Sequence, residues 1–279
     1  MTGHIVVGVD GSAPATAAVE WAAADAQRRG LSLRVVHVCR RRPEGASPPE
    51  CAALLEAAVG RARRLTRDVK VTGERLDGHV VERLRAESER ADSLVLGGRG
   101  RGGFAGMVLG SAGLALAGHA AGPVVIVRAP SPLRHDRVVA GYDGSDHSEA
   151  AMAYAVEQAR ARGAQLHVLY AWQVPLASPY AVGYGTVIED ARREEFHRAA
   201  GQAASWRERN PGLVITDEQV CDHPVSALAK ASRTADLVVV GSRGLGGLAS
   251  AVLGSVGHGV LHHVTCPVAV VRQRIEEES

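Results

Sequence analysis

The chain has 279 residues, of which 46% are hydrophobic and 4% aromatic, and its 32 basic and 30 acidic side chains leave a net charge of +2. This length predicts about two domains, and the scarcity of aromatic residues predicts aliphatic cores. The balanced charge excludes the electrostatic footprint of a nucleic-acid-binding protein. Since no apolar run reaches membrane-spanning length and no basic-then-apolar leader pattern is seen, we expect a cytoplasmic protein with no nucleic-acid or membrane partner.

The predicted elements of the first half alternate between apolar runs and helical patterns. An apolar run at 4–10 predicts a strand. Residues 12–29 have apolar side chains at helical spacing, and Gly30 follows them as a typical C-cap. Later segments predict strands at 31–39, 69–76, 92–98 and 123–128, and helices at 48–67, 79–91 and 111–121. Continuous β-branched strands separated by helices predict a parallel sheet covered on both faces.

The sequence pattern of the first half is repeated in the second half of the chain. "VGVDGS" at 7–12 matches "AGYDGS" at 140–145, an offset of 133 positions. "ADSLVLGGRG" at 91–100 matches "ADLVVVGSRG" at 235–244, an offset of 144 positions. Each copy is as long as a whole domain, so the chain is a tandem repeat rather than a solenoid.

The two copies differ in length and are separated by a proline-containing join. The second copy carries 11 extra residues, the difference between the offsets of 144 and 133, near 173–187. We interpret this insertion as a surface loop that covers either a cleft or a binding partner, and the sequence does not decide between the two. With the join at 128–136, the chain divides into two domains, residues 1–130 and 136–275.

A glycine-rich stretch follows the fourth predicted strand of each copy: "GGRGRGGFAGMVLGSAG" at 97–113 and "GSRGLGGLASAVLGSVG" at 241–257. Glycine lets backbone amides approach an anion with no Cβ in the way. A helix begins near the end of each stretch, where its first N–H groups carry partial positive charge. The position predicts phosphate binding, with a hydroxyl from Ser111 or Ser255. The alternative is a flexible loop whose serine only caps the helix.

Other phosphate-binding motifs do not fit these stretches. The P-loop pattern GxxxxGK[ST] does not occur in the chain. "GRGRGG" at 98–103 fits GxGxxG, but it follows the fourth strand rather than the first, and Pro123 stands near where an acidic residue is expected. We therefore reject a dinucleotide-binding fold.

The spacing shared by both stretches is G-x2-G-x9-G-[ST], which resembles the ATP-binding motif of the universal stress protein family. The likeness covers essentially the whole chain twice, from "VGVDGS" and "AGYDGS" to the closing "PVVIV" and "PVAVV". The chain thus resembles a tandem-domain universal stress protein of the kind common in actinobacteria. The resemblance implies an α/β fold with two domains, each a five-stranded parallel sheet of order 3-2-1-4-5 flanked by helices. Strands one and four then lie side by side where the strand order reverses.

The resemblance further implies one ATP site in each domain, with Mg²⁺ as an optional companion ion. The aspartate that ends the first strand would lie on the adenine and ribose side, and the end of the second strand would form part of the adenine wall. The glycines and the serine would contact ribose and phosphates. The implied site residues are Val9, Asp10, Val38, Gly97, Arg99, Gly100, Gly110, Ser111 and Ala112 in the first domain, and Tyr142, Asp143, Ala171, Gly241, Arg243, Gly244, Gly254, Ser255 and Val256 in the second.

Two of these assignments have alternatives. Asp10 could instead form an Asx turn before a helix capped by Ser12, although the sheet order favours its carboxylate in the crevice. The guanidinium groups of Arg99 and Arg243 could touch a terminal phosphate or point to solvent, and the sequence favours neither.

The histidines do not complete a metal-binding set in the sequence. His258 and His262 are spaced i, i+4 on a predicted helix, but no carboxylate or cysteine joins them. We therefore predict no metal site, and we expect packed, turn or capping roles for His79, His119, His223, His258, His262 and His263.

The four cysteines are Cys39, Cys51, Cys221 and Cys266, and none forms a CxxC pair. The two copies do not share their positions. A chain of this length does not need a disulfide framework, so we expect reduced thiols in a cytoplasm.

Together these features favour a nucleotide-dependent regulatory protein, and the resemblance implies a role in the stress response. Occupancy would order the glycine stretches and shift a surface seen by a protein partner. The first alternative is a slow ATPase, although no carboxylate pair at the loop could activate water and we predict no catalytic residue. The second is a scaffold with vestigial pockets. Each fifth strand is an edge that must be covered. Family members pair such edges, so the resemblance implies that the copies pack together and that two chains form a homodimer.

Overall fold

The computed structural model of the protein describes residues 3–39, 49–100, 109–128, 133–172, 201–244 and 253–273. The first half contains β1 (His4–Gly8), α1 (Ala13–Arg29), β2 (Ser32–Cys39), α2 (Pro49–Leu65), β3 (Val71–Asp77), α3 (Val80–Ser88), β4 (Ser93–Gly97), α4 (Ser111–His119) and β5 (Val124–Val127). Every element predicted for this half is present, with small differences at its ends.

The second half repeats this order of elements, with residues 201–209 helical between β7 and β8. It contains β6 (Arg137–Gly141), α5 (Asp146–Arg162), β7 (Gln165–Trp172), β8 (Ile215–Cys221), α7 (Pro224–Ala231), the short 3-10 helix η2 (Ser232–Thr234), β9 (Leu237–Gly241), α8 (Ser255–His263) and β10 (Val268–Val271). The insertion predicted near 173–187 lies outside the described residues.

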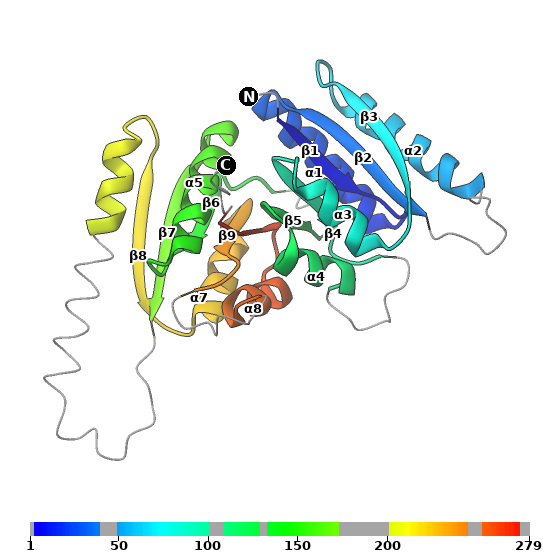
Figure 1. Ribbon diagram of the computed structural model, residues 1–279. Coiled ribbons are helices and arrows are strands. Elements are labelled where there is room, and N and C mark those ends of the chain that lie inside the picture. The colour runs from blue at the N-terminus through cyan, green and yellow to red at the C-terminus, as the bar shows by residue number, and fades with distance from the viewer. Residues whose placement is uncertain are drawn as a thin grey trace, which may run out of the picture.

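All ten strands form one sheet of order β3-β2-β1-β4-β5-β10-β9-β6-β7-β8. Each half therefore has the predicted order 3-2-1-4-5, with its own strands parallel. The halves join where β5 pairs antiparallel with β10, and Ala269 lies opposite Val125. Figure 1 shows the two halves side by side with this junction between them. The fifth strands cover each other's edges, as predicted.

The central part of the sheet is buried on both faces because consecutive residues of its inner strands, such as 5–7 of β1 and 94–96 of β4, are apolar. Val7 of β1 belongs to the cluster under α1, α2 and α5, whereas the preceding Val6 belongs to the cluster under α3, α4, α7 and α8. This alternation is the period of two expected of a strand. Together the two clusters make a three-layer domain pair, with helices above and below the sheet.

Helix α1 begins and ends at the residues that the sequence indicates. The hydroxyl of Ser12 accepts the N–H of Ala15 at 3.2 Å and caps the helix. Gly30 ends it in the left-handed conformation, with φ of 65°. Helix α5 has the same two caps, Ser145 and Gly163. The ends of β1 and β6 are thereby connected to their helices through the same short turn.

We expect Gly30→Ala to lower the free energy of unfolding by about 1–2 kcal/mol, the cost of a Cβ in the left-handed region. A Cβ at this position would meet nothing within 4 Å, so the loss is conformational rather than steric. Gly60→Ala, inside α2, is the matched control. Its Cβ would lie 3.5 Å from the Arg64 side chain, an ordinary contact, and helix propensity predicts a gain of about 1 kcal/mol. Urea denaturation measures both; effects of the same sign would contradict the prediction.

Candidate functional site

An aspartate and a glycine meet at the carboxyl ends of β1 and β4, which are neighbours in the sheet. A Cβ placed on Gly100 would lie 2.6 Å from Oδ2 of Asp10. In the second half a Cβ on Gly244 would collide with the carboxylate of Asp143 in the same way. A side chain at the second glycine of each G-x2-G motif would therefore displace the carboxylate of the aspartate.

Each aspartate also holds the turn that starts the following helix. Oδ1 of Asp10 accepts the N–H of Ser12 at 3.0 Å, and the hydroxyl of Ser12 donates to the carbonyl of Arg99 at 3.3 Å. Oδ1 of Asp143 accepts the N–H and the hydroxyl of Ser145 at 3.1 and 2.6 Å. The Asx turn and the crevice position thus coexist: Oδ1 holds the turn, while Oδ2 faces the glycine.

The first glycine of each motif packs against the helix that follows the aspartate. A Cβ on Gly97 would lie 2.6 Å from the carbonyl carbon of Pro14 and 2.7 Å from the nitrogen of Ala15. A Cβ on Gly241 would lie 2.9 Å from the carbonyl carbon of His147. No side chain fits here without displacing backbone, so these two glycines set the distance between the strand and the first turn of the helix.

The third glycine of each motif is the N-cap of the next helix. Gly110 has φ of −75° and ψ of 148°, and its N–H donates to the carbonyl of Gly98 at 2.8 Å. Gly254 likewise donates to Ser242 at 2.8 Å. Ser111 is thus the first residue inside α4, and the interpretation of this serine as an N-cap is wrong.

No side chain caps the start of either helix, because the N-cap is glycine in both. The first-turn N–H groups of α4 and α8 have no partner within their own helices, and the helix dipole adds partial positive charge there. Such a helix start suits an anion.

In the second domain these groups surround one cavity of about 260 Å³. All nine residues predicted for the second site line it: Tyr142, Asp143, Ala171, Gly241, Arg243, Gly244, Gly254, Ser255 and Val256. The cavity also has an apolar side, formed by Leu169, Leu228 and Val240. It therefore offers amides and a guanidinium to an anion, and apolar surface to a flat ring.

Several lining residues were not predicted from the sequence, among them Leu169, Pro224 and Leu228. Leu169 could have been found, since it lies two residues before Ala171 on β7 and therefore on the same face. Pro224 and Leu228 belong to α7, whose position over the cavity depends on how the helix packs. In the first domain, Val38 packs on the matching cluster, whereas Val9 lies in the cluster on the opposite face of the sheet.

The electrostatics of the second cavity are set by Arg243 and by two groups next to it. Burial, together with the charges of Arg243 and Arg272, lowers the pKa of His147. Burial also raises the pKa of Tyr142 well above its usual range, as does its hydrogen bond to Glu149. Both side chains are therefore neutral near pH 7, and Asp143 is the one carboxylate among the described residues that line the cavity.

The predicted capping and packing histidines take local roles. Nδ1 of His223 accepts the N–H of Val225 at 3.2 Å and caps α7, whereas His79 occupies the N-cap of α3 without a side-chain cap bond. The rings of His258 and His262 lie 4.8 Å apart on α8. Nδ1 of His119 lies 2.8 Å from the carbonyl of Ala115.

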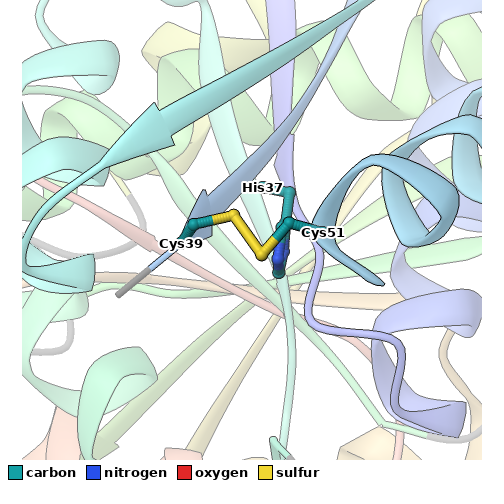
Figure 2. A group of neighbouring side chains, drawn as sticks. All are labelled: His37, Cys39 and Cys51. Atoms are coloured by element: carbon teal, nitrogen blue, oxygen red, sulfur yellow. A yellow bond between two sulfur atoms is a disulfide. The ribbon is translucent and has the colours of Figure 1, made fainter. Parts of the chain in front are cut away.

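The expectation of four reduced thiols is wrong for one pair. Cys39 and Cys51 form a disulfide, with their Cα atoms 6.4 Å apart, whereas Cys221 and Cys266 are free. Figure 2 shows the bridge between the end of β2 and the start of α2. The two residues are only 12 positions apart in the sequence. Burial raises the pKa of the Cys266 thiol to about 12, so that thiol is inert.

The fold and the site define a tandem pair of doubly wound α/β domains with a glycine-rich crevice at the reversal of strand order. The sequence profile of the universal stress protein family matches residues 1–128 and 135–272. The chain therefore belongs to the universal stress protein family and has two such domains in tandem.

Known relatives share this organisation over their whole length. A universal stress protein of Mycobacterium tuberculosis is 37% identical, and the match covers 96% of this chain and 94% of the relative. A universal stress protein of Mycolicibacterium smegmatis is 33% identical, with 97% of both chains covered. The crystal structure of a universal stress protein from Archaeoglobus fulgidus has the same fold, with a TM-score of 0.70 at 20% identity, covering 98% of this chain and 99% of that one. Within the described ranges, no helix is both long and apolar enough to cross a membrane.

Proposed function

We propose that the protein binds one ATP molecule in each domain and regulates a protein partner according to nucleotide occupancy. The observation that carries the proposal is the second-domain cavity, which is lined by all nine residues expected there. Its apolar side, with Leu169 and Ala171, suits adenine. Its opposite side, with Gly244, Gly254 and the start of α8, suits the phosphates.

The same geometry favours binding over rapid hydrolysis. A general base must lie within hydrogen-bond reach of the attacking water, and Asp143 is already bonded to Ser145 through Oδ1. Together with a Mg²⁺ ion, Asp143 would hold the nucleotide rather than activate water. The proposal includes self-association into a homodimer in the cytoplasm, which light scattering of the purified chain would test.

Isothermal titration calorimetry of the nucleotide-free chain with ATP and Mg²⁺ tests the proposal. We expect one ATP per domain, and weaker binding of AMP and cyclic AMP because each offers a single phosphate to the amides of the helix start. Chromatography of the mixture after a long incubation follows hydrolysis. Steady accumulation of ADP would favour the slow ATPase, and absence of binding would favour the scaffold.

A further inference from the structure

Three side chains with metal-binding atoms gather at the end of β2, next to Val9 and Val38 of the predicted first nucleotide site. One ring nitrogen of His37 and the sulfurs of Cys39 and Cys51 all lie within 4.8 Å of one another. Within the part of the chain that the structure describes, this is the one group of three or more such ligands. Figure 2 shows His37 and Cys39 on the same strand, with Cys51 reaching them from α2.

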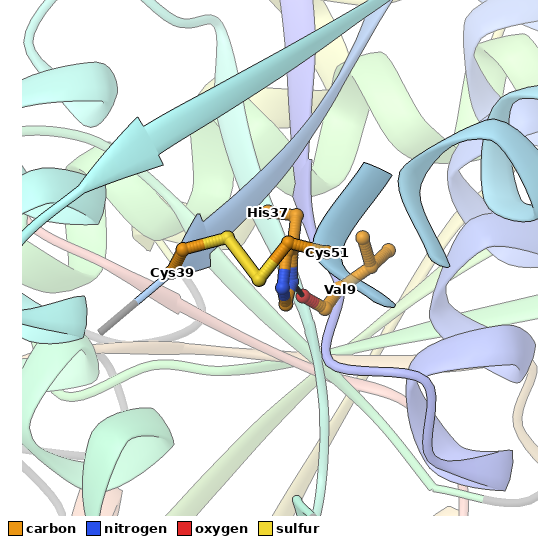
Figure 3. Close-up of a disulfide and its surroundings, with 4 residues drawn as sticks. All are labelled: Val9, His37, Cys39 and Cys51. Carbon is orange, nitrogen blue, oxygen red and sulfur yellow. Dashed lines mark hydrogen bonds between the residues drawn. A yellow bond between two sulfur atoms is a disulfide. The ribbon is translucent and has the colours of Figure 1, made fainter. Parts of the chain in front are cut away.

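A hydrogen bond fixes the imidazole of His37 in a metal-binding form. Nδ1 lies 2.7 Å from the carbonyl oxygen of Val9 (Figure 3). Because a carbonyl oxygen can only accept, Nδ1 carries the hydrogen in this hydrogen bond, and a zinc site that keeps the bond must use Nε2. A ring N–H that donates to a backbone carbonyl is the usual outer contact of a histidine ligand, because it fixes both the tautomer and the ring orientation.

The ligand set and its burial select a soft divalent cation. Two thiolates and an imidazole favour Zn²⁺ over Mg²⁺ or Ca²⁺. Cys39 is 2% exposed and His37 is 9% exposed, so two bare thiolates would be costly there. A Zn²⁺ ion cancels both charges. Tetrahedral coordination with Zn–S bonds of about 2.3 Å needs sulfurs about 3.8 Å apart, a separation that fits within this group once the disulfide opens.

We propose that the reduced protein binds Zn²⁺ through Nε2 of His37 and the thiolates of Cys39 and Cys51, with a fourth position open to water. The disulfide is the oxidised, metal-free form of the same site. A thiol or phosphine reductant supplies two electrons, and two protons from solvent complete the two thiols. Zn²⁺ then replaces those two protons when it binds. A small-molecule disulfide oxidant reverses this by thiol–disulfide exchange: it takes up the two electrons and two protons to become two thiols, the Cys39–Cys51 bond forms again, and the ion is released.

The site is specific to the first domain and lies behind the proposed adenine wall. At an offset of 133 residues, His37 corresponds to Tyr170 and Cys39 to Trp172, neither of which matches the ligand set. Since neighbouring side chains of a strand point to opposite faces, Val38 lies on the face of β2 opposite to the two ligands. The zinc proposal does not depend on the nucleotide proposal, although Val9, whose carbonyl holds His37, is among the residues predicted for the first nucleotide site.

The test is a zinc titration of the full chain, freed of metal, reduced with a phosphine and read out against a colorimetric chelator. We expect one tightly bound zinc ion per chain, and none after oxidation to the disulfide. Cys51→Ser should weaken binding by about 100-fold or more, beyond what loss of an outer contact costs. Cys221→Ser is the matched control, because Cys221 is an exposed free thiol outside the group, and it should bind zinc like the parent protein.

Cobalt(II) gives a second measurement that does not depend on affinity alone. The reduced parent protein should show the thiolate charge-transfer band of a tetrahedral site, and both Cys51→Ser and His37→Gln should lose or shift it. Circular dichroism confirms that each variant is folded. Because Cys51 is only partly buried at the start of α2, Cys51→Ser is a milder change than one at Cys39. Zinc binding that is unchanged in Cys51→Ser, or absent from the reduced parent protein, would overturn the proposal.

Discussion

Gly110→Val is expected to abolish ATP binding in the first domain while the chain stays folded. Gly110 has backbone angles that any residue adopts, and a Cβ there would lie 3.7 Å from the nitrogen of Gly100, an ordinary contact. The branched side chain would instead occupy the space beside the first amides of α4, where the proposal places the phosphates. In calorimetry the number of ATP sites should fall by half.

Gly254→Val is the equivalent substitution in the second domain, and Gly97→Ala is a substitution for which we expect a different effect. Gly254→Val should remove the other site, although its Cβ lies at a tighter 3.3 Å from the Cα of Arg243. Gly97→Ala should instead destabilise the fold by about 1–3 kcal/mol, because its Cβ would overlap the backbone of α1. A folded Gly110→Val protein that retains both ATP sites would remove the glycine stretch from the proposed mechanism.

The strands and helices could be predicted because the evidence for them is local and repeated, whereas their order in the sheet was implied by the resemblance to the universal stress protein family. Apolar runs such as β1 and β4 differ clearly from the helical spacing of α1, and each pattern occurs twice. The crevice followed from that order, since the carboxyl ends of neighbouring parallel strands lie at the same edge of the sheet. Asp10 and Gly100 were therefore placed together although they are far apart in the sequence.

Features that depend on packing between helices were not predictable in this way. Leu228 lines the second cavity because α7 lies across it, and no spacing in the sequence records that contact. Cys39 and Cys51 meet because a helix returns to the end of its preceding strand. The burial of Asp25 also depends on packing between helices. It occurs in a polar part of α1, a pattern typical of a solvent-exposed helix end, yet its side chain is fully buried.

Asp25 is buried because α1 packs against α5 of the other domain. Its Oδ1 accepts a hydrogen bond from Arg162 at 3.1 Å, and its Oδ2 accepts one from the side-chain amide of Gln158 at 3.1 Å. Arg29 lies 3.6 Å from Oδ2. Asp92 also binds Arg29, at 2.6 and 2.9 Å. Asp25 is therefore the charge on which Arg162 depends, whereas Arg29 has a second partner.

The pKa values of the two arginines reflect this difference. Burial lowers the pKa of Arg162 to about 10, and the charge of Asp25 only partly opposes this effect. Burial also acts to lower the pKa of Arg29, but the hydrogen bond and charge of Asp92, together with the charges of Tyr154 and Asp25, more than offset this, and the net change is upward. Loss of Asp25 should therefore leave the Arg162 cation buried and uncompensated, while Arg29 keeps its partner.

Asp25→Ala should lower the free energy of unfolding by about 3–5 kcal/mol, the range for removing one partner of a buried ion pair. Asp92→Ala is the control: it also removes an acidic partner of Arg29 but leaves Asp25 in place, so its cost should be smaller. Denaturant unfolding of the intact chain measures both. An Asp25→Ala chain as stable as the parent protein would show that the domain interface does not depend on this cluster.

The charge component of that loss has its own dependence on pH. In the folded chain the pKa of Arg162 is about 10, which is below the ordinary value that this group has in the unfolded chain. Above pH 10 the unfolded chain therefore binds more protons at this group, and the free energy of unfolding increases as pH rises. Asp25→Asn keeps a polar side chain but removes the charge, which lowers the folded pKa of Arg162 further. The pH range in which Arg162 adds stability then begins at lower pH in the variant. The difference in the free energy of unfolding between the parent protein and the variant should therefore shrink from neutral pH toward 10. If this difference in the free energy of unfolding stays constant or grows over the same pH range, the loss of stability comes from packing and hydrogen bonding rather than from the uncompensated charge of Arg162.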